Sequence, residues 1–149
     1  MRGALLQSPK HILLIEDNPG DVLLLREALG IAGLKAQMHA VEDGEAGIDY
    51  LHQRGAHTDA PRPDLIILDL NLPLLAGHQV LRQIKTSRSL KRIPVVIMSA
   101  SGVPKDIMAS YERLANSYII KPVRFNDLVD IARSLKAFWF DAVRLPPSD

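Results

Sequence analysis

The sequence predicts an α/β fold in which helices cover both faces of a five-stranded parallel sheet. Short apolar runs rich in β-branched residues alternate with segments of helical periodicity, which is the pattern of repeated strand–helix units. Four of these runs end at polar residues of different chemical kinds: Glu16, Asp69, Ser99 and Lys121. Because parallel sheets of this type bind ligands at the carboxyl ends of their strands, the same pattern predicts one shared site.

Length, composition and charge are those of a single domain. The chain has 149 residues, of which 47% are hydrophobic and 23% charged, and its formal net charge of +1 does not favour direct nucleic-acid binding. No apolar run reaches the roughly 20 residues that span a bilayer. The absence of cysteine excludes disulfides and thiolate metal sites. We therefore expect a cytoplasmic protein without membrane contact, divided into a leader (1–9), a domain (10–143) and a tail (144–149).

The first strand–helix unit is expected at the start of the domain. His11–Ile15 is a short apolar run that predicts a strand. Asn18 followed by Pro19 is typical of a helix N-cap and first turn, so a helix is expected from about Gly20 to Ala32. Gly33 can adopt the left-handed conformation that commonly ends a helix.

The second unit contains a less hydrophobic strand. Residues 36–41 are only partly apolar, which indicates a strand at the edge of the sheet. The turn at 42–44 leads into a helix that carries Ala46, Tyr50 and Leu51. The following segment up to Pro63, with its glycine, histidine and prolines, is the longest expected loop.

The last three units repeat the alternation. Strands are expected at Leu65–Leu68, Val95–Met98 and Tyr118–Ile120. The expected helices are one that begins at Gly77 with Val80, Leu81 and Ile84 on a single face, one from about Lys105 to Ala115, and one from about Phe125 to Val143.

Strand order brings the acidic residues together. Five parallel strands with right-handed crossovers favour the doubly wound order 2-1-3-4-5, which places the first strand beside the third. Glu16, Asp17 and Asp69 then become neighbours, and such a carboxylate cluster is tolerated best around a hard cation such as Mg²⁺. A carboxylate there can act as nucleophile toward a phosphoryl group, with Lys121 as cation and Ser99 as hydrogen-bond donor. The residues thus predict an aspartyl-phosphate site.

The same residues carry a resemblance to a known family. In the order and spacing of its motifs the chain resembles the receiver domain of two-component response regulators, on Glu16-Asp17-Asn18, Asp69 followed by Leu72-Pro73 and Gly77, Ser99-Ala100, and Lys121-Pro122. The resemblance runs from Lys10 to about Lys136. It implies a flavodoxin-like (βα)5 fold and a phosphoacceptor signalling protein, which catalyses only its own phosphorylation and dephosphorylation.

The resemblance implies roles for the acidic residues. Asp69 would accept a phosphoryl group from a histidine kinase. Asp17 and Asp69 would hold Mg²⁺, or Mn²⁺, together with the backbone carbonyl of Asn71. Glu16 would act on the ion through water.

Roles for the other motif residues are implied in the same way. Ser99 and Lys121 would bind the phosphoryl oxygens. Ser99 and Tyr118 would form the switch that reports phosphorylation. Pro122 occupies the position at which the family has a cis peptide bond, and Ser101 would flank the path of the phosphoryl group.

Loop and tail motifs resemble the stand-alone regulators of phytochrome-type histidine kinases. These motifs are Asp17-Asn18-Pro19-Gly20-Asp21, Asp43-Gly44-Glu45, the long loop before Pro63, Phe138-Trp139-Phe140, and Leu145-Pro146-Pro147. The resemblance implies a phytochrome-like kinase as partner. Only Arg144–Asp149 follows the last expected helix, so no output domain is expected, and the signal would pass by conformational change and protein docking.

Phe138, Trp139 and Phe140 cannot all face one core, because successive residues of a helix lie about 100° apart. At least one of the three rings is expected at a surface or in a contact. This favours a homodimer through the fourth helix, fifth strand and fifth helix, with Trp139 or a neighbour at its centre. The alternative is a tail that folds back and buries the ring against its own domain.

Two other functions share parts of the pattern. A haloacid-dehalogenase-like phosphatase also forms an aspartyl phosphate, but it needs a second acid two residues after the nucleophile, where this chain has Asn71. A flavodoxin-like flavin-binding module has the same strand order, but its first turn would offer glycines and hydroxyls to a phosphate rather than acids. The five histidines lack metal-ligand spacing and are expected at the surface or in packing.

Overall fold

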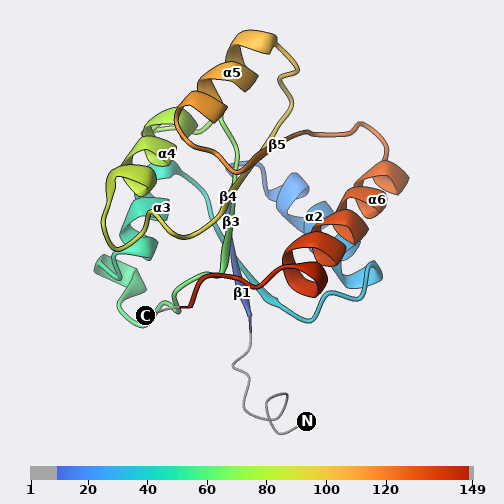
Figure 1. The fold of residues 1–149 in the computed structure, drawn as a ribbon, viewed down its shortest axis with the longest axis horizontal. Coiled ribbons are helices and arrows are strands. Elements are labelled where there is room, and N and C mark those ends of the chain that lie inside the picture. The colour runs from blue at the N-terminus through green and yellow to red at the C-terminus, as the bar shows by residue number, and fades with distance from the viewer. Residues whose placement is uncertain (1–9, 148–149) are drawn as a thin grey trace, which may run out of the picture.

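The computed structural model describes residues 10–147, whose centre is a parallel sheet with helices on both faces (Figure 1). Its strands are β1 (His11–Ile15), β2 (Gln37–Val41), β3 (Leu65–Leu68), β4 (Val95–Ser99) and β5 (Ser117–Ile120), in the order β2-β1-β3-β4-β5. Every neighbouring pair is parallel. The predicted fold class and strand order are confirmed. The expected leader (1–9) and the last two residues of the expected tail lie outside the described residues.

Two groups of helices enclose the sheet (Figure 1). One face is covered by α2 (Pro19–Ile31) and α6 (Phe125–Leu135), and the other by α3 (Gly44–Leu51) and α4 (Gly77–Thr86), with α5 (Pro104–Glu112) beside α4. A short 3-10 turn, η1 (Gly55–His57), lies in the long loop, and a π-helical segment, η2 (Lys136–Ala142), follows α6. No helix among residues 10–147 combines the length and hydrophobicity needed to cross a membrane.

The central strands are buried on both faces, which explains their continuous apolar sequences. All four side chains of β3 have 0% exposure. Ile66 and Leu68 pack in the core beneath α3 and α4, whereas Leu65 and Ile67 pack beneath α2 and α6. Since alternate side chains point to opposite faces, one four-residue strand anchors both layers of helices and places Asp69 at its end.

The predicted helix caps form as the residue types require. The Asn18 side chain accepts a hydrogen bond from the Asp21 N–H at 3.1 Å and caps α2. Gly33 follows that helix with a φ of 82°, in the left-handed region. Asp43 caps α3 through a 2.7 Å hydrogen bond. These local contacts set the directions in which the chain leaves β1 and β2.

One helix end and one peptide bond differ from expectation here, and the end of the last helix differs as well. The helix expected to reach Ala115 ends at Glu112, because Leu114 adopts a left-handed φ of 71°. The peptide bond before Pro122 is trans, since no cis bond occurs between residues 10 and 147. An X-Pro bond favours trans by about 0.5–1 kcal/mol unless the surroundings select cis.

The helix expected to run from 125 to 143 is α-helical only as far as Leu135. Beyond it the hydrogen bonds widen to π spacing, as shown by the Val143 N–H, which donates to the Phe138 carbonyl at 3.0 Å. An ion pair of 2.8 Å between Lys136 and Asp141 has the same five-residue spacing and supports the wider turn.

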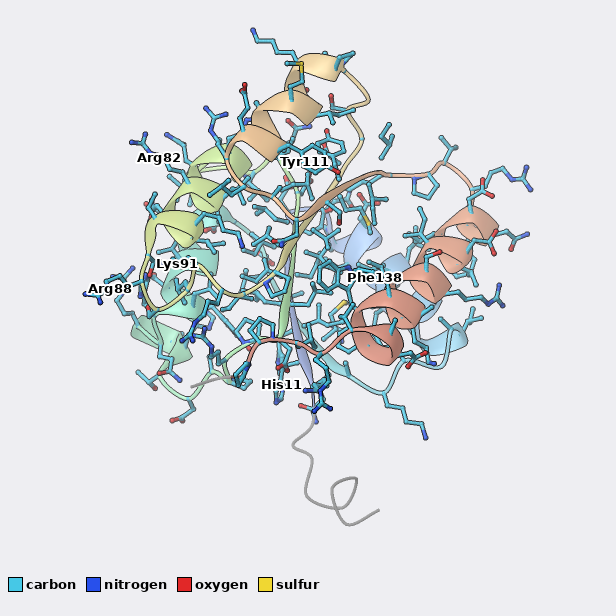
Figure 2. The ribbon with its side chains drawn as sticks, viewed as in Figure 1. His11, Arg82, Arg88, Lys91, Tyr111 and Phe138 are labelled. Atoms are coloured by element: carbon cyan, nitrogen blue, oxygen red, sulfur yellow. The ribbon has the colours of Figure 1, made fainter. Side chains whose placement is uncertain are left out.

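The three consecutive aromatic rings divide between core and surface. Trp139 and Phe140 pack against the core of their own domain on the α2 and α6 side. Phe138 is 53% exposed (Figure 2) and meets Trp139 edge to face, with ring centroids 5.0 Å apart. The fold-back alternative therefore describes Trp139, and within this aromatic segment Phe138 is the ring that faces outward.

Candidate functional site

Three carboxylates meet where β1 and β3 end. These strands are paired, with Ile15 opposite Leu68, so the residues that follow them become neighbours. One carboxylate oxygen from each of Glu16, Asp17 and Asp69 lies within 4.8 Å of the other two. Glu16 and Asp69 are buried and Asp17 is exposed, so the cluster has one side open to solvent. Such a set of hard oxygen donors suits a divalent cation.

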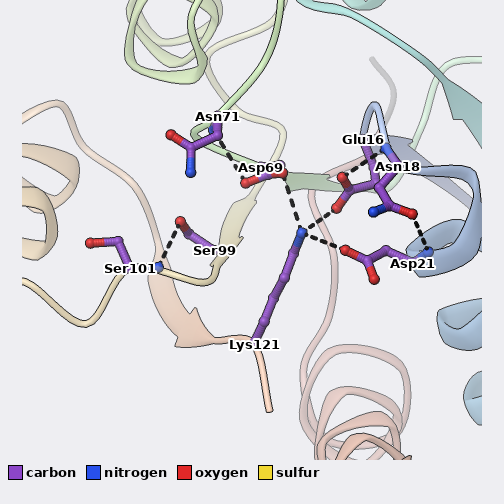
Figure 3. A network of polar contacts seen from close by, with 8 residues as sticks. All are labelled: Glu16, Asn18, Asp21, Asp69, Asn71, Ser99, Ser101 and Lys121. Atoms are coloured by element: carbon purple, nitrogen blue, oxygen red, sulfur yellow. Dashed lines mark hydrogen bonds and ion pairs between the residues drawn. The ribbon is translucent and has the colours of Figure 1, made fainter. Parts of the chain in front are cut away.

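Lys121 directly follows the edge strand β5, and its side chain extends to this cluster (Figure 3). Its Nζ atom lies 2.6 Å from Glu16 Oε1 and 3.2 Å from Asp69 Oδ2. The Lys121 N–H donates to the carbonyl of Ser99 at 2.7 Å, so the pairing of β4 with β5 positions the side chain. The ammonium therefore occupies the place where positive charge is needed between two buried carboxylates.

Burial and these contacts shift the pKa values of Glu16 and Lys121. Burial raises the pKa of Glu16 to about 7; the hydrogen bond from Lys121 opposes the rise and the Asp69 charge adds to it. Burial alone would lower the pKa of Lys121, but its hydrogen bonds to Glu16 and Asp21 and the charge of Asp69 hold that pKa above its usual value. One ammonium compensates this acidic cluster only in part.

Asp21 is a member of the site that the sequence did not identify. It stands in the first turn of α2, and its Oδ2 accepts a hydrogen bond from Lys121 Nζ at 3.0 Å. Its side chain is 41% exposed, so this contact is at the rim of the site. The available signal was an acid in the first turn of the helix that begins at the end of β1, a position that also points to the carboxyl edge of the sheet.

Asp69 is held through both carboxylate oxygens. Oδ1 accepts a hydrogen bond from the Asn71 N–H at 3.3 Å, and Oδ2 faces Lys121. The side chain is buried, and the start of α4 packs directly against this turn. A Cβ atom at Gly77 would lie 2.4 Å from the Asp69 carbonyl oxygen, so only glycine permits this approach. The strand end and the helix start together fix the orientation of the carboxylate.

Ser99 and Tyr118 both bond to the loop that follows β4. The Oγ atom of Ser99 accepts a hydrogen bond from the Ser101 N–H at 3.3 Å, and Ser99 has 0% exposure. Among the residues that the structure describes, Ser99 makes no hydrogen bond with Asp69. Tyr118 donates its hydroxyl to the Ser101 carbonyl at 2.8 Å. Ser101 Oγ donates in turn to Asp106 Oδ2 at 2.5 Å, which ties the loop to α5.

The structure thus brings together most of the predicted site residues. Glu16, Asp17, Asp69 and Lys121 share one cluster, and the Asn71 backbone lies against it. The side chains of the two predicted switch residues, Ser99 and Tyr118, both form hydrogen bonds with Ser101 rather than with the side chains of this cluster. The predicted aromatic segment 138–140 lies in η2. Among the described residues it makes no contact with the cluster.

The chain is similar in sequence to a known protein family and to a characterised relative. A family model described as the response regulator receiver domain matches residues 12–133. The response regulator Rcp1 of Synechocystis is 41% identical over 138 residues, which cover 93% of this chain and 94% of that protein.

Solved structures are similar over the same length. A Mn²⁺-bound form of Rcp1 has a TM-score of 0.87 at 40% identity and covers 93% of this chain and 100% of that one. A phosphorylated cyanobacterial phytochrome response regulator, RcpA, has a TM-score of 0.89 at 41% identity and covers 94% of this chain and 100% of that one.

Proposed function

The chain belongs to the response regulator receiver family, and on this basis we propose that Asp69 is the carboxylate on which it is phosphorylated. Family membership confirms the predicted function as a response regulator and does not favour a phosphatase or a flavin-binding module. The observation that carries the assignment of Asp69 is its position: buried at the end of β3, with one oxygen held by a backbone N–H and the other beside an ammonium.

The proposed reaction is transfer from a phosphohistidine of a histidine kinase. An oxygen of Asp69 forms a bond to phosphorus while the phosphorus–nitrogen bond breaks and the imidazole leaves. Lys121 Nζ, 3.2 Å from Asp69 Oδ2, is placed to bind an oxygen of the transferred group. The product is an acyl phosphate that water can cleave, so the protein would act on itself only.

We further propose that the carboxylates hold Mg²⁺ or Mn²⁺. Asp17 and Asp69 would be ligands together with the carbonyl of Asn71, and Glu16 would act through water. The fit rests on oxygen atoms that converge within 4.8 Å and on more carboxylate charge than Lys121 compensates. When bound, the ion would neutralise charge on the phosphoryl oxygens. The Mn²⁺-bound form of the relative Rcp1 supports this proposal.

The proposed switch uses the loop after β4. Ser99 would exchange its contact with the Ser101 N–H for a phosphoryl oxygen. Tyr118 would register the change because its hydroxyl is bonded to the carbonyl of the same Ser101. Since Ser101 also holds Asp106 of α5, a movement of this loop would reach the surface of the domain.

The kinase is proposed to be a phytochrome-like photoreceptor, because the relative RcpA is a phytochrome response regulator. Such an encounter would take place in the cytoplasm. We also propose a homodimer through α5, β5 and α6, on the side where large apolar side chains are exposed: Met108 at 62%, Tyr111 at 47%, Ile120 at 49% and Val123 at 103%. Phe138 is the member of the aromatic segment available to that interface.

Substitution of the acceptor tests the proposal directly. We expect the Asp69→Asn protein to lose labelling by acetyl phosphate in the presence of Mg²⁺, because an amide cannot form the acyl phosphate. Intact-mass spectrometry would count the phosphoryl groups. Asp130→Asn, an equivalent change at an exposed position of α6, should label like the wild type. Labelling of Asp69→Asn at the wild-type stoichiometry would contradict the assignment.

A further inference from the structure

Positive charge is concentrated in one part of the chain. The 36 consecutive residues 70–105 contain no aspartate or glutamate. They do contain six cations: Arg82, Lys85, Arg88, Lys91, Arg92 and Lys105. Because the formal net charge of the whole chain is only +1, the remaining residues are acidic on balance. The near-neutral total therefore conceals a strongly basic region.

Five of the six cations lie in α4 or in the turn that joins α4 to β4, on one side of the molecule. Figure 2 shows Arg82, Arg88 and Lys91 projecting outward along the same edge. All three are exposed, and within residues 10–147 none of them is paired with an acid. Lys85 has a structural role, since its Nζ donates to the carbonyls of Lys91 and Ile93 at 3.1 and 2.9 Å. Lys85 thereby holds the basic turn against the end of α4.

A groove runs from this basic edge toward α5. The α4 side contributes Arg82, Lys85 and Thr86, and the end of α5 contributes Glu112, Arg113 and Leu114. The groove is open to solvent and has a volume of about 440 Å³. Its lining combines three cations with a single acid and with Leu114, which is 64% exposed. The groove thus offers both charge and an apolar contact.

Its position separates it from the phosphorylation site. The helices α4 and α5 run back from the carboxyl ends of the strands, so their last residues lie toward the amino ends of β4 and β5. Asp69 stands at the carboxyl end of β3. A ligand in the groove and a phosphoryl group on Asp69 would therefore occupy opposite ends of the sheet.

We propose that this α4–α5 groove binds an acidic segment of a partner protein, one in which carboxylates alternate with apolar side chains. Carboxylates would pair with Arg82 and Arg113, while an apolar side chain would cover Leu114. Nucleic acid fits less well, because its phosphates would gain nothing from Leu114 and would meet the charge of Glu112. The acidic remainder of the surface would repel a long polyanion beyond the groove.

A binding measurement on the full chain tests this inference. The probe is a fluorescein-labelled synthetic peptide of alternating glutamate and leucine, followed by fluorescence anisotropy. Arg82→Glu and Arg113→Glu should each weaken binding at least about fivefold, because each replaces attraction of a carboxylate by repulsion. Raised salt should weaken binding as well. Lys35→Glu makes the same charge change at an exposed position before β2 and should leave the affinity within about twofold.

The outcomes separate this inference from the proposed function. Because the groove lies away from Asp69, the Asp69→Asn protein should bind the peptide as the wild type does, even if it cannot be phosphorylated. Absence of saturable binding would overturn the inference, as would equal losses in Lys35→Glu and Arg82→Glu. Tighter binding of an oligothymidine probe with the same dependence on Arg82 would assign the groove to nucleic acid instead. Circular dichroism would establish that each variant is folded.

Discussion

Lys121 decides the electrostatics of the site, because its ammonium is shared by carboxylates that cannot all be satisfied. Its shortest contact, 2.6 Å, is with the buried Glu16, and its contact with Asp69 is longer, at 3.2 Å. Asp21 draws the same ammonium toward α2. A substitution at Asp21 therefore acts on the acceptor through Lys121 without touching the acceptor itself.

We expect Asp21→Asn to weaken the binding of Mg²⁺ or Mn²⁺ by about two- to fivefold. One negative charge is lost near the ion, and Lys121 is released toward Glu16 and Asp69, where it competes with the ion. Isothermal titration calorimetry with either cation measures the change. Asp127→Asn, an exposed acid in the first turn of α6, serves as the control. Unchanged or tighter cation binding by Asp21→Asn would be inconsistent with a shared ammonium.

Histidine protonation should destabilise the fold in acid. His39 Nε2 lies 3.0 Å from His11 Nδ1, and burial, His11 and Arg26 lower the pKa of His39. Its folded pKa lies below the unfolded value of about 6.5, so the unfolded state binds more protons. The stability it contributes is present above that value and is lost as pH falls through the folded pKa. Burial lowers the pKa of His78 too, with the same sign.

Urea unfolding between pH 7.5 and 5.0 tests this expectation. The free energy of unfolding of the His39→Gln protein should fall less steeply with decreasing pH than that of the wild type. His52→Gln, at an exposed position after α3, should keep the wild-type slope. Identical slopes for wild type and His39→Gln would show that the His11–His39 pair does not contribute to the pH dependence of stability.

At the scale of elements, the start of α4 depends on a close approach to β3. A Cβ atom at Gly77 would lie 2.4 Å from the Asp69 carbonyl oxygen and 2.5 Å from the Leu70 Cα. Both neighbours are backbone atoms, which cannot rotate away as a side-chain end can. We expect Gly77→Ala to cost about 1–3 kcal/mol of stability, and to disturb the orientation of Asp69.

Gly30→Ala is the matched control for this prediction. A Cβ atom at Gly30 in α2 meets nothing within 4 Å. Alanine there should raise the free energy of unfolding by about 0.5–1 kcal/mol, because it restricts the unfolded chain and favours the helix. Urea denaturation of both variants gives the comparison. Equal effects in the two variants would show that the packing of α4 against the turn after β3 is not tight.

At the scale of the whole molecule, exposed apolar side chains gather on α5, β5 and the loop that follows β5. Sedimentation velocity with and without acetyl phosphate and Mg²⁺ tests the proposed dimer. Met108→Glu should shift the protein to the monomer mass, since it places a charge among exposed apolar side chains. Leu23→Glu changes a similarly exposed leucine of α2 and should sediment like the wild type. A wild-type protein that is monomeric under both conditions would refute the dimer.

Most of the fold could be predicted because its signals are short-range. The apolar runs correspond to β1, β3, β4 and β5, and the Asn18 and Gly33 signals mark the ends of α2. Strand order follows from connection rules that involve the whole chain but require no side-chain detail. The predicted acidic cluster follows from that order, because paired strands end side by side.

Some features could not be predicted because they depend on packing. The end of the last helix changes to π spacing, and Trp139 turns onto its own core. The helix before β5 stops early at Leu114, and the bond before Pro122 stays trans. The two helix ends and the direction of Trp139 each differ from the alternative by a small local energy, so the surroundings select them. The bond before Pro122 keeps the trans form that X-Pro bonds favour by themselves.

Hydrophobic periodicity and strand order are properties of the chain, so they are enough to place the acidic residues at the carboxyl edge of the sheet. How those residues share charge depends on their positions in the folded domain. Lys121 bonds to Asp21 across 100 positions of sequence, and Ser99 turns its hydroxyl to Ser101 rather than to Asp69. Hydrogen bonds and ion pairs form at distances of about 3 Å, and no spacing along the chain specifies such a distance.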